Sequence, residues 1–276
     1  MKIRAVLLDM DGTLLGKSQV AVSTRNMRAI QRALQKGVSV IPCTGRVLDM
    51  LPPQLITQEG LRYFVTCHGA RVVDSEKNET LYEDVIPPEE AAQLMALLEG
   101  RGLYNEIAAN ATIYLEKTIA DTLDRQPVPE HHLWYMRDRC YTALEKPSEF
   151  MRKNGVGVEK MNIYGVPAEL QQEIYDAVTA TGFIKHTRLG AGPNLEFSHR
   201  TLDKIKATDT LLEKLGISYA ETMAIGDSSS DLEIIRRCGV GVAMGNAPEN
   251  IKREADDVTV VNTEDGVALA FDKYVL

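Results

Sequence analysis

The hydrophobic pattern near the start of the chain is that of a buried strand followed by an amphipathic helix. The run from Ile3 to Leu8 shows no alternation of polar and apolar residues, which predicts a strand buried on both faces of a parallel sheet. Ser23 is a candidate N-cap, and apolar residues then recur at helical spacing until Gly37. Residues 38–42 form a second short apolar run, so this part of the chain reads as a strand–helix–strand unit.

The same alternation returns in the last third of the chain, and a segment richer in hairpins lies between. The expected later elements are a helix over 202–215, a strand over 222–225, a helix over 232–238, and strands over 240–243 and 257–261. Pro87 and Pro88 interrupt the pattern and mark a linker. We therefore predict the α/β fold class, with a doubly wound, Rossmann-like parallel sheet core from residues 1–84 and 199–276. Residues 85–198 are predicted to be an inserted α/β cap domain.

One stretch of the inserted segment, residues 126–140, shows no clear periodicity. It contains Pro127 and Pro129, followed by the adjacent pair His131 and His132. On an extended chain, adjacent side chains point to opposite faces, so the pair does not indicate a metal site. A solvated loop is the favoured interpretation of this stretch.

Two carboxylates end the first predicted strand. Asp9 and Asp11 are two residues apart, so on an extended chain they share a face, and the turn at Gly12 keeps both near one point. Open α/β sheets bind their ligands at this carboxyl end of the strands. Two carboxylates held so close repel, which raises the pKa of one of them unless a cation neutralises the pair. A hard cation with oxygen ligands, such as Mg²⁺, suits them.

Composition and charge narrow the class of protein. The 276 residues are 44% hydrophobic and 25% charged, as in globular proteins, and the net charge of -8 argues against a nucleic-acid partner. No apolar run approaches the length that spans a bilayer, and the first strand leaves no room for a signal peptide. The four cysteines, Cys43, Cys67, Cys140 and Cys238, are scattered. A cytoplasmic protein with reduced thiols and no membrane partner is expected.

Four motifs resemble those of the haloacid dehalogenase-like hydrolases, and they occur in the family's order. Asp9 to Thr13 resembles the Asp-x-Asp-Gly-Thr motif, and Thr44-Gly45-Arg46 resembles the second motif. Lys204 matches the lysine of the third, and Gly226 to Asp231 matches the Gly-Asp-x-x-x-Asp of the fourth. The position and size of the insertion look like the α/β cap of the Cof-type branch. That branch includes many sugar-phosphate and nucleotide phosphatases.

The resemblance implies a Mg²⁺-dependent phosphatase that acts on small phosphorylated metabolites through an aspartyl-phosphate. Asp9 is then the nucleophile and Asp11 the general acid and base. The implied Mg²⁺ ligands are the Asp9 carboxylate, the Asp11 backbone carbonyl and Asp227. The implied phosphate-binding residues are Thr44, Lys204 and Ser230. Asp231 and Asn246 are implied to hold the residues of the site in place.

Four positions depart from the pattern of this branch. His68 stands where Asn is usual, Ile205 and Ser228 where Gly is usual, and Ser230 where Asn is usual. The departures at His68, Ile205 and Ser230 leave open a catalytically weak protein that binds phosphate ligands. A phosphomutase that uses the same aspartyl-phosphate also stays open, because it differs from a phosphatase in the access of water under the cap. The sequence indicates neither the particular substrate nor the oligomeric state.

Overall fold

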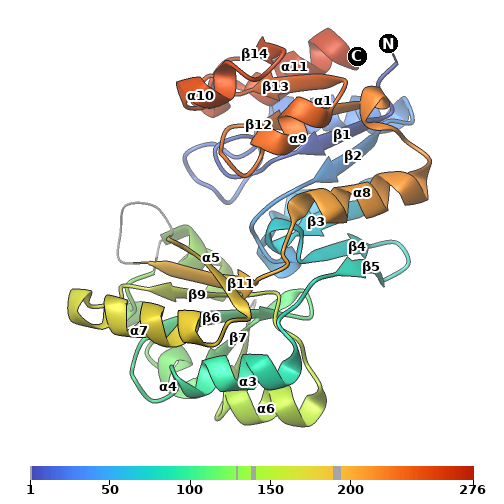
Figure 1. The fold of residues 1–276 in the computed structure, drawn as a ribbon. Coiled ribbons are helices and arrows are strands. Elements are labelled where there is room, and N and C mark those ends of the chain that lie inside the picture. Colours follow the sequence, from blue (N-terminus) through green and yellow to red (C-terminus); the bar gives the residue numbers. More distant parts are fainter. Residues whose placement is uncertain (1, 129, 138–140, 189–193) are drawn as a thin grey trace. The chain divides into compact units, whose positions relative to one another are not determined.

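The structure, a computed structural model, describes residues 2–128, 130–137, 141–188 and 194–276. The chain divides into two compact units, and each is described here by itself. The core unit comprises Met1–Arg46, Leu51–Tyr82 and Asp203–Leu276, and the inserted unit comprises Val47–Met50 and Glu83–Leu202. Figure 1 shows the elements of both units in sequence colours.

The core unit is built on a five-stranded sheet in which every pair of neighbouring strands is parallel. In spatial order its strands are β14 (Asp257–Val258), β13 (Val240–Ala243), β12 (Thr222–Gly226), β1 (Ala5–Leu8) and β2 (Ser39–Pro42). All four residues of β1 are buried, which agrees with its continuous apolar sequence. The predicted α/β class with a parallel sheet core is thereby confirmed.

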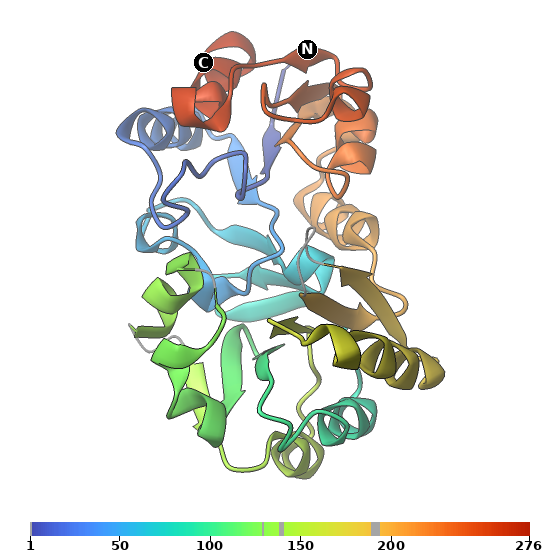
Figure 2. The same cartoon turned by 90° about the vertical axis from the view of Figure 1, so that its left-hand side faces the viewer.

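Helices cover both faces of this sheet, as a doubly wound fold requires (Figure 2). One face carries α8 (Lys204–Leu215) and α9 (Leu232–Arg237), whose apolar residues pack on β1, β2 and β12. On the other side α1 (Thr24–Gln35) contacts β2 and α11 (Gly266–Tyr274). The shorter helices of the unit are α2 (Pro53–Ile56) and α10 (Glu249–Lys252).

A second, three-stranded sheet of the core unit continues from the β2 side. Its strands are β3 (Tyr63–Thr66), β4 (Arg71–Asp74) and β5 (Glu79–Glu83), in that spatial order. A parallel bridge joins Cys43 to Val65, and Thr44 N donates to Val65 O over 2.9 Å. The carboxyl end of β3 therefore lies beside the carboxyl end of β2.

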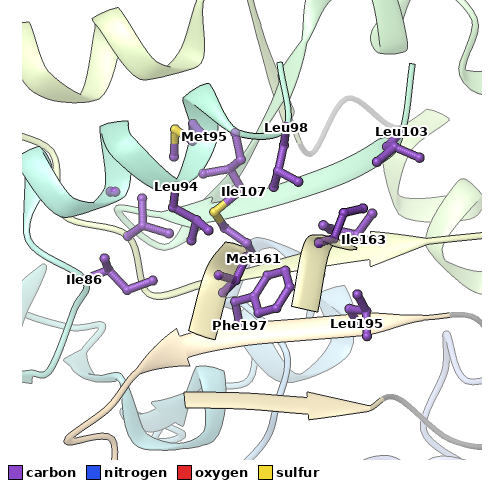
Figure 3. Close-up of a cluster of buried hydrophobic side chains, with 14 of the residues drawn as sticks. Ile86, Leu94, Met95, Leu98, Leu103, Ile107, Met161, Ile163, Leu195 and Phe197 are labelled. Carbon is purple, nitrogen blue, oxygen red and sulfur yellow. The ribbon is translucent and has the colours of Figure 1, made fainter. Parts of the chain in front are cut away.

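The inserted unit has its own six-stranded sheet with helices packed against it. The spatial order is β10 (Ile184–Arg188), β11 (Leu195–His199), β9 (Lys160–Tyr164), β6 (Tyr104–Ala109), β7 (Thr112–Glu116) and β8 (Tyr141–Leu144). Its helices are α3 (Pro88–Ala96), α4 (Lys117–Ala120), α5 (Glu130–Arg137), α6 (Pro147–Asn154) and α7 (Ala168–Ala180). Apolar side chains of α3, α6 and α7 form one buried cluster with strand residues such as Met161 and Phe197 (Figure 3).

The favoured loop between residues 126 and 140 is wrong, because α5 occupies most of its described part. His132 lies on this helix, and its Nδ1 is 3.0 Å from Glu106 Oε1. Tyr135 and Met136 on the same helix are buried. These tertiary contacts stabilise a helix whose sequence carries little periodicity of its own.

The described cysteines Cys43, Cys67 and Cys238 are buried and none of the three is in a disulfide, while Cys140 lies outside the described residues. Burial raises the pKa of the Cys43 thiol to about 12. In the part of the chain that the structure describes, no helix combines the length and the hydropathy needed to cross a bilayer.

Asn26 joins the first helix of the core unit to the last. Ser23 is the N-cap of α1, as predicted, and its hydroxyl accepts from Asn26 N. The Asn26 side chain is buried, and its Oδ1 accepts from Ala268 N over 2.9 Å. Ala268 lies in the first turn of α11, whose N-cap residue, Asp265, makes no side-chain cap. Asn26 therefore satisfies a backbone donor of a helix to which it does not belong.

Replacing Asn26 with alanine is expected to lower the free energy of unfolding by about 1–3 kcal/mol, because a buried N–H then lacks its acceptor. The midpoint of urea unfolding measures the change. Arg28→Ala on the exposed side of the same helix is the control, and we expect a shift within about 0.5 kcal/mol for it. Equal shifts for the two variants would contradict the assigned role of Asn26.

Candidate active site

The carboxyl ends of β1, β2 and β12 meet at one edge of the core sheet. The register sets these ends level, with Leu8 opposite both Pro42 and Ile225. The ladder continues one residue further, since Asp9 N donates to Ile225 O over 3.0 Å. Asp9, Thr44 and Asp227 therefore leave three neighbouring strands at the same edge.

Three carboxylates converge at this edge. One oxygen each of Asp9, Asp227 and Asp231 lies within 4.8 Å of the other two. The Asp9 and Asp231 side chains are buried, and Asp227 is half-buried. Burial and the neighbouring Asp231 carboxylate hold the pKa of Asp9 well above its usual value, although Lys204 opposes the shift. Because the three charges are alike and largely buried, the ionised carboxylates destabilise the folded state unless a cation compensates them.

Lys204 supplies one positive charge to the cluster. Its Nζ donates to Asp231 Oδ1 over 2.8 Å, and both side chains are buried. Burial works against the charged form of each partner, but it is outweighed by their mutual attraction together with Asp9 near Lys204 and the Ser228 hydrogen bonds to Asp231. The pKa of Lys204 is therefore raised and that of Asp231 is lowered. The lysine begins α8, where the Asp203 side chain caps the helix by accepting from Ile205 N.

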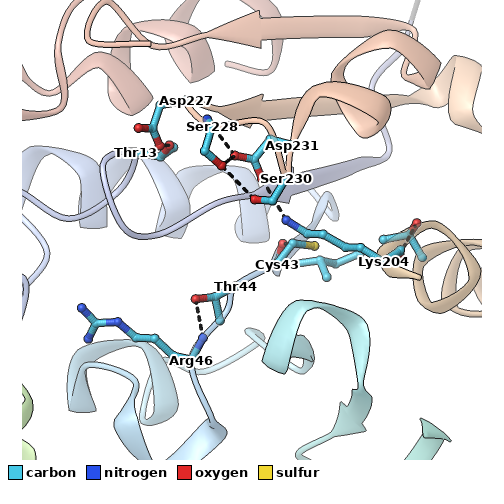
Figure 4. Close-up of polar contacts among 11 residues, drawn as sticks. Thr13, Cys43, Thr44, Arg46, Lys204, Asp227, Ser228, Ser230 and Asp231 are labelled. Carbon is cyan, nitrogen blue, oxygen red and sulfur yellow. Dashed lines mark hydrogen bonds and ion pairs between the residues drawn. The ribbon is translucent and has the colours of Figure 1, made fainter. Parts of the chain in front are cut away.

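Two serines of the turn after β12 surround Asp231 (Figure 4). Ser228 donates to Asp231 Oδ2 from its backbone N over 3.1 Å and from its Oγ over 2.8 Å. Ser230 is exposed, and its Oγ lies 2.8 Å from Ser228 Oγ. Asp231 is thus held by Ser228 on one oxygen and by Lys204 on the other.

Thr13 and Asn246 orient the Asp227 side chain. Thr13 Oγ1 donates to Asp227 Oδ1 over 2.9 Å. Asn246 Nδ2 donates to Gly12 O over 2.8 Å and to Asp227 Oδ2 over 3.3 Å. Gly12 has a φ of +83°, and a Cβ there would lie 2.4 Å from Asp227 Oδ2. Only glycine therefore allows this close approach.

Asp11 points to a different partner from the other three carboxylates. Arg46 binds it with two hydrogen bonds, Nε to Oδ2 over 2.8 Å and Nη2 to Oδ1 over 2.5 Å. Arg46 Nη2 also donates to Gln19 O over 2.8 Å. The guanidinium is 8% exposed and the Asp11 side chain is 41% exposed. Asp11 is therefore the accessible carboxylate of the edge, and a bidentate arginine fixes it.

Thr44 is buried beside this arginine. Its Oγ1 accepts from Arg46 N over 3.1 Å. The Thr44 O–H has no acceptor among the residues that the structure describes, so its proton is available to a ligand.

The structure thus places all eight residues singled out from the sequence in the core unit. Seven of them are tied together by the contacts described above, through the carboxylate cluster or through Arg46. Ser230 is the most peripheral, because it reaches the cluster only through Ser228. Sequence reasoning gave no role to Arg46 or Ser228, although both stand inside recognised motifs. Arg46 stands two residues after Thr44, and the sequence does not say which carboxylate it binds.

The donor set of the cluster fits a hard divalent cation. Its members are all carboxylates, and one lysine offsets only part of their charge. The Asp9 carboxylate with its raised pKa is the group that gains most from a neighbouring cation. The Asp11 side chain does not belong to this set of three carboxylates.

Comparison with known proteins identifies the family. The model of the haloacid dehalogenase-like hydrolases matches residues 6–271. Since the match covers nearly the whole chain, the chain belongs to this family of hydrolases. The predicted family is thereby confirmed, and the phosphatase relatives described next confirm the predicted class of enzyme, a hydrolase of phosphoric monoesters.

The relatives are similar along their whole length. The chain is 28% identical to phosphatase YwpJ of Bacillus subtilis, over 96% of this chain and 98% of that protein. It is 29% identical to 5-amino-6-(5-phospho-D-ribitylamino)uracil phosphatase YcsE of Bacillus subtilis, over 99% and 96%. A crystal structure of a haloacid dehalogenase-like hydrolase from Bacteroides thetaiotaomicron superposes with a TM-score of 0.83, 27% identity and 99% coverage of both chains.

Lys204→Met is expected to destabilise the core unit by about 3–5 kcal/mol, because Asp231 is left buried without its partner. The double variant Lys204→Met, Asp231→Asn removes both charges and keeps an acceptor for Ser228, so most of the lost stability should return. Thermal and urea unfolding of the two variants measure the difference. A double variant as unstable as Lys204→Met would show that the ion pair does not carry this stability.

Proposed function

We propose that the chain is a Mg²⁺-dependent phosphatase that hydrolyses phosphomonoesters of small metabolites through an aspartyl-phosphate on Asp9. The observation that carries the proposal is the buried Asp9 carboxylate beside the Lys204 cation, with two further carboxylates within 4.8 Å. An anionic nucleophile, a fixed cation and hard oxygen ligands at one point are what attack on a phosphate ester requires.

In the first step Asp9 attacks phosphorus. A bond forms between an Asp9 oxygen and phosphorus, and the bond from phosphorus to the ester oxygen breaks. Asp11 gives a proton to the departing oxygen, so the products are an alcohol and the phosphorylated Asp9. Thr44 donates its free O–H to a phosphate oxygen, and Lys204 balances the charge of the transferring group. Ser230 is proposed as a further donor to the phosphate.

In the second step Asp11 takes a proton from a water molecule. The water oxygen bonds to phosphorus while the bond from phosphorus to Asp9 breaks. Inorganic phosphate leaves, Asp9 is again a carboxylate, and Asp11 again carries its proton.

Arg46 constrains these proton transfers. Its two N–H groups engage both oxygens of Asp11, which suits the carboxylate form present in the second step. The acid form accepts these two hydrogen bonds more weakly, because its hydroxyl oxygen carries no negative charge. We propose that Asp11 releases one of them when it acts as an acid, which its exposure permits.

Mg²⁺ would be held by the carboxylates of Asp9 and Asp227 and by the backbone carbonyl of Asp11. When bound it would offset the charge between these groups and the phosphate and align the phosphoryl group for attack. Thr13 and Asn246 orient Asp227 for this task, and Asp231 holds Lys204.

Small phosphorylated metabolites are the proposed substrates, because the relatives named above are phosphatases and one of them acts on a ribitylamino-uracil phosphate. We propose in addition that the inserted segment, residues 85–198, selects among phosphate esters, as a cap domain would.

Asp9→Asn should abolish turnover and leave the fold intact, because the amide is nearly isosteric but is not a nucleophile. We expect a fall in kcat of at least about 10³-fold, measured as phosphate released from an aryl phosphate. Asp121→Asn, at an exposed carboxylate of the inserted unit, is the matched control and should leave kcat unchanged. If Asp9→Asn turned over substrate at nearly the rate of the unaltered protein, the covalent mechanism would be excluded. If the unaltered protein released an isomerised sugar phosphate in place of free phosphate, it would be a mutase.

Removal of divalent metal should abolish turnover, and Mg²⁺ should restore it while Ca²⁺ does not. Ca²⁺ takes more ligands at longer distances, which spoils the alignment of nucleophile and phosphate. The measurement is activity after dialysis against a chelator and after addition of each metal. Full activity in excess chelator would remove the metal from the mechanism.

A further inference from the structure

The turn that follows β3 has an uncommon backbone. Cys67, His68 and Gly69 are consecutive, and their φ angles are +49°, +57° and +97°. Residues with a Cβ seldom adopt positive φ, although histidine and asparagine do so more readily than most. A conformation of this kind persists where the surroundings hold it in place, and it is concentrated at functional sites. We call Cys67–Gly69 the left-handed turn.

The first half of this turn is bound to the end of β2. Cys67 N donates to Arg46 O over 2.9 Å, and His68 N donates to Thr44 O over 2.9 Å. These two hydrogen bonds hold the backbone on both sides of Gly45. One of the held residues carries the free Thr44 hydroxyl, and the other carries the guanidinium that binds Asp11.

The His68 ring packs directly on Gly45. A Cβ at Gly45 would lie 2.4 Å from both Cε1 and Nε2 of the ring. No side chain therefore fits at position 45 while the ring keeps its place. The ring and the two backbone hydrogen bonds hold the 44–46 segment together.

The second half of the turn abuts the start of α8. A Cβ at Gly69 would lie 2.7 Å from Lys204 Cα, 3.2 Å from Lys204 N and 3.3 Å from Ala207 Cβ. Two of these three atoms are backbone, which cannot move aside as a side chain can. The turn therefore packs against the residue whose ammonium enters the carboxylate cluster.

We propose that the left-handed turn is a positioning element that sets the distance between Thr44 and Lys204, with His68 as a positioning residue. This inference rests on the proposed function, in which those two side chains bind the same phosphate. Thr44 follows a strand and Lys204 begins a helix 160 positions later in the chain. The turn contacts the backbone of both, so it fixes the spacing of two donors that a rigid phosphate must reach at once.

The proposal also accounts for the residue types at positions 68 and 69 of the turn. Asparagine, usual here in the Cof-type branch, and histidine both tolerate the left-handed conformation, so the backbone form survives the exchange. Histidine adds a ring that fills the space above Gly45, and glycine at position 69 leaves room for Lys204.

Gly69→Ala tests the contact with α8. We expect kcat for an aryl phosphate to fall about 10- to 100-fold, because a displacement near 1 Å in a positioned group has effects of this size. The matched control is Gly216→Ala at the other end of α8, where φ is +61° and a Cβ would meet nothing within 4 Å. The control should lose stability but keep kcat within about twofold.

A second pair of variants tests the role of the His68 ring without Gly69→Ala, which could fail to fold. Gly45→Ala should lower kcat severalfold in the unaltered protein, because the new Cβ displaces the His68 ring. In the His68→Asn background the ring is gone, so Gly45→Ala should change kcat by less than about twofold. Equal effects in both backgrounds would overturn the role of the ring.

Binding of inorganic phosphate, measured by calorimetry on the full chain, separates this inference from the proposed function. We expect Gly69→Ala to weaken phosphate binding about tenfold and Gly216→Ala to leave it unchanged. If the Asp9→Asn protein turned over substrate, the proposed mechanism would be wrong. Phosphate binding by Gly69→Ala would still test whether the left-handed turn positions Thr44 and Lys204. Equal phosphate affinity and equal kcat in Gly69→Ala and Gly216→Ala would overturn this positioning role.

Discussion

The repulsion among three carboxylates at one sheet edge is the constraint on which the rest of the core unit depends. Asp9, Asp227 and Asp231 approach within 4.8 Å in a largely buried place, where charge is poorly screened. Two of them are held there by specific donors, Asp231 by Lys204 and Ser228, and Asp227 by Thr13 and Asn246. The lysine begins one helix and the other donors lie in turns at strand ends. The residues that meet this electrostatic requirement therefore come from both ends of the chain.

Close approach of backbone segments is the second condition, and glycine provides it where the site is most crowded. Gly12 allows the turn after β1 to pass Asp227, and Gly69 allows the turn after β3 to pass Lys204. In both places a single Cβ would meet a functional residue, so the geometry of the charged groups is set by the absence of a side chain beside them. Close packing against glycine and the electrostatics of the site therefore both constrain Asp227 and Lys204.

The parts of this architecture that arise from local pattern could be predicted from the sequence. Continuous apolar runs identified β1 and its neighbours, and residues at the ends of those runs, Asp9, Thr44 and Asp227, meet because parallel strands end at one edge. Contacts between distant residues could not be predicted. The sequence shows Arg46 but not that its partner is Asp11, and α5 forms where tertiary contacts such as that of His132 with Glu106 compensate for weak periodicity.

The place of β1 in the sheet has a consequence for synthesis of the chain. β1 pairs with β2 on one side and with β12 on the other, and β12 ends at Gly226. A growing chain therefore holds β1 with one edge unpaired until β12 has been made. Residues 83–202 are continuous and have their own buried cluster, so they can fold first. The half-built sheet must wait with an exposed, apolar strand edge, which is the stage at which this protein is most vulnerable to aggregation.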